Sequence, residues 1–257
     1  MKSWKIILMT GVFALGLLVL AGCESDPVAP QETYEVDAEA AEEWSLQAIE
    51  MISQMAAAVG PASQGDFSTL GPDKVASEPV WDEVQMAWVL DETETFSEGD
   101  PPTSTGEIRV SVWIQFRTDE GPLPSPLGAT QMEYRESAGM TLHSEHEQGT
   151  SDLDFDLTTG MVVTFVENGY DMDGTGAADI TASATTEGRT ENMNLTMTWG
   201  LDLTAPLEGC PAGTAFVQLG QFRTEVQYDG QGAANWTMTG PNYNAAGVEA
   251  VPCGLVQ

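Results

Sequence analysis

The sequence predicts a mainly β protein, in which an antiparallel meander of about eight to ten strands curves into an open sheet, a sandwich or a partial barrel. Two observations indicate this fold class. From residue 107 onward, apolar and polar residues alternate with a period of two, and turn-forming residue pairs separate the alternating runs. A third observation adds one N-terminal helix packed on the sheet, because apolar residues recur at helical spacing over about 37–59.

The residues at both ends of the predicted helix and the apolar stripe along it support this assignment. Asp37 can cap the N-terminus, and Gly60 followed by Pro61 is expected to end the helix. The polar stripe is acidic, so an anionic membrane surface would repel it. Packing against the β body is therefore favoured over an amphipathic membrane helix.

The predicted strands each have one apolar and one polar face, which is typical of an antiparallel sheet covered on one side. The clearest alternating runs are 108–117, 152–157, 192–203 and 234–239.

The segments between strands carry hairpin signals and one proline-rich loop at Pro122, Pro124 and Pro126. Near Gly220 the alternation changes phase, which predicts a bulge. The hairpin pairs are Asn168-Gly169, Asp173-Gly174, Glu187-Gly188 and Asp229-Gly230.

The first residues have the pattern of a secretory leader. Lys2 and Lys5 precede a nearly continuous apolar run over 6–20, and the run ends in Leu20-Ala21-Gly22-Cys23. This order resembles the lipobox signal peptide of bacterial lipoproteins over residues 1–23. The resemblance implies cleavage before Cys23 and lipid on that cysteine. The alternative is an uncleaved anchor, but the run is shorter than the roughly 20 apolar residues a spanning helix needs.

The resemblance also implies an organisation and an address. Residues 1–22 would be the signal peptide, 23–35 a lipidated acidic tether, and 36–257 one β-rich domain. The lipid on Cys23 would hold the protein at a membrane of the cell envelope. Glu24, rather than an aspartate, follows the cysteine, which favours the outer membrane over the inner membrane.

The charge is strongly acidic, with 40 Asp and Glu against 8 Lys and Arg and a formal net charge of −32. Such a chain repels nucleic acid, so no nucleic-acid partner is expected. Cation binding and a cationic partner remain open, and a solvated acidic surface is the simplest interpretation. The oligomeric state is not indicated by the sequence.

Two cysteines remain once Cys23 is assigned to lipid. Cys210 and Cys253 would then stand in an oxidising compartment, where they can pair in only one way. A disulfide between them is predicted, with two free thiols as the alternative.

Residues 171–179 resemble the opening of a calcium loop. Asp171, Asp173, Thr175 and Asp179 offer oxygen ligands at suitable spacing, and Gly174 suits the tight turn. Position 12 is Ala182, so the bidentate carboxylate is missing. A plain acidic hairpin tip between Val166 and Ile180 is the favoured interpretation, so no cofactor is expected, with calcium as the alternative.

Trp113 is unusual because it lies on the polar side of its predicted strand. With Arg109 and Arg117 beside it, the indole could form a platform for a sugar or an apolar ligand. The alternative, which is favoured, is that the 37–59 helix covers it. His143 and His146 point to opposite faces if their segment is a strand, so they are not expected to bind one metal.

The function predicted from the sequence is that of a lipid-anchored, non-enzymatic domain. It would bind or carry an apolar or envelope-derived ligand, or dock an envelope protein. The first alternative is a calcium-stabilised structural or surface-adhesion module, and the second is a glycosidase-like enzyme. Catalysis is disfavoured because the chain has no nucleophile-elbow, zinc-protease, Walker or Rossmann motif.

Overall fold

The computed structural model describes residues 37–63, 79–99, 102–146, 149–186, 189–206, 209–251 and 253. The predicted leader, Cys23 and the predicted tether lie outside these ranges, so the interpretations that rest on them stay predictions.

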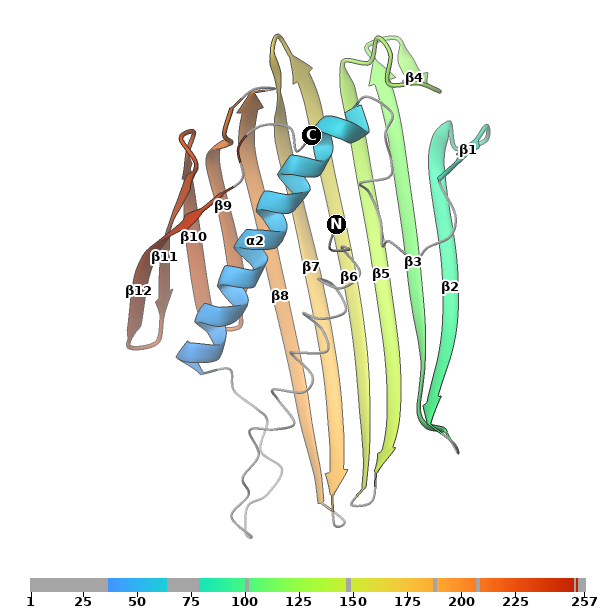
Figure 1. The fold of residues 1–257 in the computed structure, drawn as a ribbon, viewed down its shortest axis with the longest axis vertical. Helices are drawn as coiled ribbons and strands as arrows, with labels where there is room; N and C mark the ends of the chain where they lie inside the picture. The colour runs from blue at the N-terminus through green and yellow to red at the C-terminus, as the bar shows by residue number, and fades with distance from the viewer. Residues whose placement is uncertain are drawn as a thin grey trace.

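The described residues form one helix followed by strands in a single antiparallel sheet (Figure 1). The elements are α2 (Ala38–Ser63), β1 (Val80–Asp82), β2 (Ala87–Gly99), β3 (Pro102–Thr118), β4 (Gly121–Leu123), β5 (Gln131–His146), β6 (Gly149–Val166), β7 (Gly169–Thr186), β8 (Arg189–Pro206), β9 (Ala212–Leu219), β10 (Phe222–Asp229), β11 (Ala233–Gly240) and β12 (Tyr243–Ala250).

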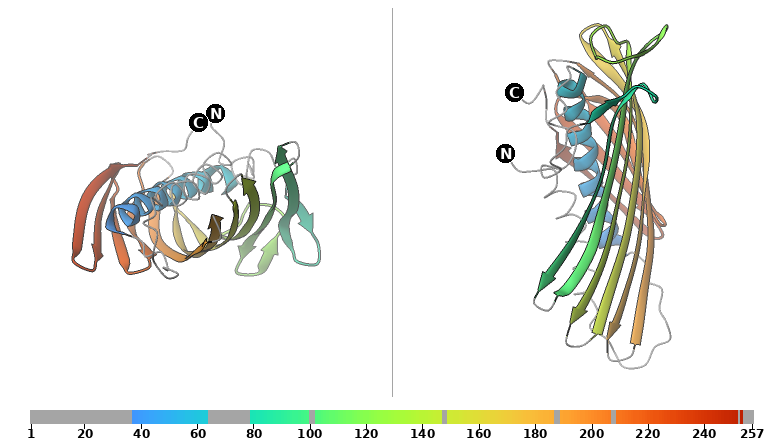
Figure 2. Two further views of the ribbon diagram at one scale, coloured as in Figure 1. Left: turned by 90° about the horizontal axis from the view of Figure 1, so that it is seen from below. Right: turned by 90° about the vertical axis from the view of Figure 1, so that its right-hand side faces the viewer.

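The sheet is a meander, with strands paired in chain order from β1 to β12 except that the short β4 pairs only with β3. It is curved and open, because β1 and β12 remain at its two edges (Figures 1 and 2). The predicted fold class is confirmed in its curved-sheet form, with twelve strands instead of eight to ten.

One face of the sheet is apolar over most of its width. Cross-strand neighbours such as Ile114, Tyr134 and Met161 lie on this face, and all three are at most 6% exposed. The same face continues through Met172, Leu203 and Val217 in the later strands, each 1% exposed. Because side chains alternate along a strand, the residues between them point to the opposite, polar face.

Helix α2 lies in the concave side of the sheet, on this apolar face (Figure 2). The Ala40 amide donates to Asp37 Oδ1 at 2.8 Å, which is the predicted N-cap. Thr224 Oγ1 donates to Ser45 Oγ at 2.8 Å, and Ser53 Oγ and Tyr228 Oη share a hydrogen bond of 3.2 Å. No helix in the described ranges is long and apolar enough to span a membrane.

Three local predictions are wrong. The helix continues through Gly60 and Pro61 to Ser63, because a proline removes only its own amide donor and one such loss is tolerated near a helix end. Asp173-Gly174 lies within β7 and is not a turn, since β7 pairs along its length with β6 and β8. Gly220 lies in the tight turn joining β9 to β10, with a φ of 54°, so the change of phase marks a hairpin and not a bulge.

Two other predicted turns are confirmed. Residues 167–168 join β6 to β7, and Asn168 has a φ of 68°, a conformation that asparagine tolerates better than most residues. Asp229-Gly230 opens the turn between β10 and β11, where Asp229 accepts hydrogen bonds from the amides of Gln231 and Ala233.

Cys210 and Cys253 are joined as a disulfide, across a sequence separation of 43 residues. Cys210 precedes β9 and Cys253 follows β12, so the bond ties together the two ends of the β9–β12 meander. The Val251 amide donates to the Gly232 carbonyl at 3.0 Å and holds the same end of the chain.

Two glycines, Gly176 on the apolar face and Gly160 on the opposite face, compare how closely the two faces of the sheet are packed. A Cβ added at Gly176 would lie 2.1 Å from the ring of Trp199, which is 1% exposed, whereas one added at Gly160 would meet nothing within 4 Å. Gly176→Ala is therefore expected to lower the free energy of unfolding by about 1–3 kcal/mol. Gly160→Ala is the matched control and is expected to change it little. Urea denaturation followed by tryptophan fluorescence measures both, and equal effects would contradict the packing.

Candidate ligand-binding groove

Trp113 lies on the polar, convex face of β3. Its neighbours Val112 and Ile114 point the other way and are at most 1% exposed. Trp113 is half-buried, and α2 packs on the opposite face of the sheet. The favoured interpretation that the helix covers Trp113 is therefore wrong, because the strand alternation that buries Val112 turns the indole away from the helix.

Arg135 lies over the indole. It stands directly opposite Trp113 on β5, and its guanidinium carbon is 4.7 Å from the centroid of the Trp113 ring, in cation–π contact. Arg135 Nε donates to Glu133 Oε1 at 2.9 Å, and a second guanidinium nitrogen also contacts this carboxylate. Glu133 thus holds the guanidinium in place against the indole.

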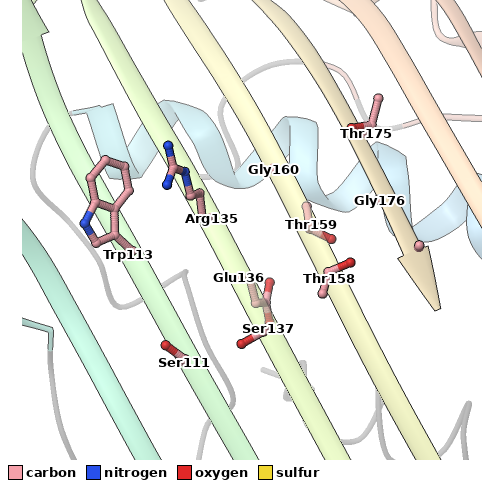
Figure 3. Close-up of a pocket in the computed structure, with 11 residues that line it drawn as sticks. Ser111, Trp113, Arg135, Glu136, Ser137, Thr158, Thr159, Gly160, Thr175 and Gly176 are labelled. Carbon is pink, nitrogen blue, oxygen red and sulfur yellow. The ribbon is translucent and has the colours of Figure 1, made fainter. Parts of the chain in front are cut away.

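A groove of about 540 Å³ runs from Trp113 across β5, β6 and β7 (Figure 3). Apart from Trp113 and Arg135, the side chains that line it on this face are small. We call it the Trp113 groove and define it by Ser111, Trp113, Arg135, Ser137, Thr158, Gly160, Thr175 and Ala177. Because no atom lies within 4 Å of the place where a Cβ would stand at Gly160, the floor is open there.

A second hollow of about 490 Å³ adjoins the Trp113 groove and shares Ser111, Ser137 and Thr158 with it. It adds Arg109 from β3 and Asp156 from β6. Arg109 Nε contacts Glu107 Oε1 at 3.1 Å. Of the two arginines predicted beside Trp113, Arg109 therefore lines the adjoining hollow. Arg117 lines neither hollow, and its Nη1 lies 3.6 Å from Glu133 Oε2.

The groove offers one aromatic side chain, one guanidinium and several hydroxyl groups, which are able to form van der Waals contacts and hydrogen bonds. Within the described ranges, no group of three or more His, Cys, Asp or Glu side chains is arranged to hold a metal ion.

The four residues proposed as calcium ligands lie on β7, in extended conformation. They point to the same convex face, but strand geometry spreads residues 171–179 over about 26 Å. Asp171 accepts a hydrogen bond from Thr204 at 2.7 Å, and Asp179 accepts one from Thr196 at 2.6 Å. Cross-strand pairing keeps the segment straight, so it forms neither the tight turn of a calcium loop nor a hairpin tip, and both predictions of its local structure are wrong. Thr175 belongs instead to the Trp113 groove.

His143 is on the convex face near the end of β5, on the same side as Glu145. Its Nδ1 is 2.7 Å from Asp152 Oδ1, and its Nε2 is 3.8 Å from Glu145 Oε1. The hydrogen bond with Asp152 raises the pKa of His143 above its ordinary value. This cluster is separate from the Trp113 groove.

Beneath the groove, on the apolar face, Tyr134 Oη donates to Glu136 Oε2 at 2.6 Å. Burial raises the pKa of Glu136 above its ordinary value, although the hydrogen bond from Tyr134 acts in the other direction. Burial and the neighbouring carboxylate both raise the pKa of Tyr134. Glu136 is thus a half-buried acid on a mostly apolar face.

Sequence reasoning missed Arg135, the residue that contacts the indole. The predicted neighbours, Arg109 and Arg117, lie on the same strand as Trp113, whereas the observed contact depends on the register between β3 and β5. The sequence did indicate that Arg135 lies on a polar strand face, because Met132, Tyr134, Ala138 and Met140 alternate with mostly polar residues. Glu136 breaks this alternation, since it stands at a position where an apolar residue is expected.

The chain matches no protein-family model, and no curated protein and no solved structure matches it.

The half-buried acid Glu136 predicts a pH dependence of stability. Because the pKa of Glu136 is raised, the folded state binds more protons than the unfolded state above the ordinary pKa, and stability falls as the pH rises through that window. Glu136→Gln, which keeps an acceptor for Tyr134, is expected to raise the urea midpoint near neutral pH. The gain should shrink at about pH 4, where the unfolded carboxyl is also largely protonated. A gain independent of pH would contradict the burial of the charge, and exposed Glu145→Gln is the control.

Proposed function

We propose that this protein is a non-enzymatic, lipid-anchored binding protein of the cell envelope, and that its Trp113 groove binds a neutral saccharide. The observation that carries the proposal is the groove itself, in which a half-buried indole with an arginine fixed over it borders an open floor of hydroxyl-bearing and small residues.

The residue types favour a sugar. A sugar ring has an apolar C–H face, which can pack on an indole, and hydroxyl groups around its rim. Ser111, Ser137, Thr158 and Thr175 can exchange hydrogen bonds with those hydroxyls. Arg135 adds further donors beside the indole.

The charge of the protein favours a neutral ligand. The net charge of −32 repels polyanions over the whole surface. On the convex face, the Trp113 groove has only hydroxyl, small, aromatic and guanidinium side chains, and the guanidinium is paired with Glu133. Glu136 also lines the groove but lies on the strand face that Tyr134 shares, so an uncharged ligand meets no unpaired charge on the convex face.

The location rests on the lipobox resemblance. Lipid on Cys23 would place the β domain at a membrane of the envelope, with the outer membrane favoured by Glu24. The domain would then stand among the saccharides of the envelope, held at the end of the 23–35 tether.

A second candidate is carriage of an apolar ligand on the concave face. The long strands β5–β8 favour it, because they extend beyond the N-terminal end of α2 in Figure 1. The apolar residues of these strands include Leu153 and Met193, which belong to or pack against the core. Native mass spectrometry of the protein purified from its own membrane tests it. A bound lipid is expected for a carrier, and its absence would count against this function.

Replacing the indole tests the saccharide function. Trp113→Ala is expected to weaken binding to the best neutral oligosaccharide on a glycan array by at least about tenfold, or about 1.4 kcal/mol, because the indole supplies the aromatic surface of the groove. Trp81→Ala is the control, because Trp81 is also half-buried but belongs to β1 and packs edge-on against Trp88.

A second variant separates binding from folding. Gly160→Leu places a side chain in the open floor and is expected to abolish the same binding without lowering the urea midpoint. If the wild-type protein binds no neutral oligosaccharide, or if both variants bind as it does, the proposed function is wrong.

A further inference from the structure

Trp113 and Arg135 begin a line of directly paired residues that crosses the convex face. The register continues from Arg135 to Gly160, then to Thr175, Gly200 and Phe216. We call these six residues the aromatic row. It has an aromatic side chain at each end and, between Arg135 and Phe216, only two glycines and one threonine.

The far end of the row repeats the arrangement at its start. The half-buried Phe216 lies over Gly200, where an added Cβ would stand 2.5 Å from the phenyl ring. The guanidinium carbon of Arg223 is 4.4 Å from the centroid of that ring, and Arg223 Nε lies 3.0 Å from Glu225 Oε1. Each end therefore presents an aromatic ring with an arginine over it, and each arginine is held by a glutamate.

A band without carboxylates joins the two ends. Beside the aromatic row runs a parallel line of paired residues on the same face: Ser111, Ser137, Thr158, Ala177, Thr198, Gln218 and Arg223. The next lines outward are acidic, with Asp156 and Asp179 on one side and Asp173 and Asp202 on the other. Although the chain has a net charge of −32, the two lines carry no charged residue on β6, β7 and β8.

The aromatic row is long compared with one sugar. It crosses five strand-to-strand steps, from β3 to β9, which at about 4.8 Å per step separate the two aromatic positions by about 24 Å along the surface. The Trp113 groove occupies the part from β3 to β7. A ligand that contacts both rings must therefore be a chain of several sugar rings, lying across the strands.

We infer that the convex face binds an extended, neutral polysaccharide chain, which lies along the aromatic row and contacts the Trp113–Arg135 pair at one end and the Phe216–Arg223 pair at the other. The inference rests on the proposed saccharide binding and adds the length, charge and direction of the ligand. The acidic lines on both sides exclude acidic polysaccharides, and the hydroxyl-bearing band provides hydrogen-bond partners along the chain.

The test uses length series of β-1,4-linked cello- and chito-oligosaccharides, from disaccharide to octasaccharide, and isothermal titration calorimetry of the full chain. Affinity is expected to rise with length until the chain reaches both rings, because the second contact is then intramolecular. Phe216→Ala is expected to remove the gain of the longer chains and to leave the short ones unaffected. Trp113→Ala is expected to weaken binding at every length.

The control is Val166→Ala, which shortens an apolar side chain that is 42% exposed on the same face but outside the row. If Trp113→Ala abolishes binding while Phe216→Ala changes nothing at any length, the proposed function stands and the extended site is wrong. If no oligosaccharide of either series binds, both proposals fail. Binding of an extended cationic peptide in place of the saccharides would also overturn the inference, since the acidic lines would then be the contact.

Discussion

The continuous strand register of the meander is the constraint on which the other features depend. From β1 to β12, apart from the short β4, each strand pairs with the next in antiparallel order, and most of the apolar residues lie on one side of the sheet. A shift by one residue in any strand would move its apolar residues to the polar face. The register therefore fixes the core, and in fixing the core it also fixes which polar residues become neighbours on the convex face.

The apolar face needs α2 because an open sheet of this width cannot cover itself. Helix α2 packs into the concave side, where Trp44, Ile49 and Ile52 are buried. The hydrogen bonds of Ser45 and Ser53 to Thr224 and Tyr228 satisfy polar groups that the same burial removes from water. The disulfide between Cys210 and Cys253 adds a covalent constraint at the C-terminal end of the sheet, where the strands are shorter.

The convex face is left without a covering element among the described residues, and its side chains are arranged by the same register. Most of it carries Asp, Thr and Asn, which is what a solvated acidic surface requires. The exceptions are two aromatic rings with arginines over them and the uncharged band that joins them. Trp113 and Phe216 are 103 positions apart by their numbers in the sequence, yet they are the two ends of one line of cross-strand neighbours.

The sequence by itself determined the features that depend on local periodicity. The alternation of apolar and polar residues predicted the strands, the Asp37 cap predicted the start of α2, and Trp113 was recognised as an aromatic residue on a polar face. Only the tertiary structure decided which residues of different strands become neighbours. Arg135, and not Arg109 or Arg117, contacts the indole, and Asp171–Asp179 became a strand, because pairing with both neighbouring strands outweighs the turn preference of one Asp-Gly pair. The physical reason is that period two is a property of each strand, whereas register is a relation between strands that the alternation within one strand does not contain.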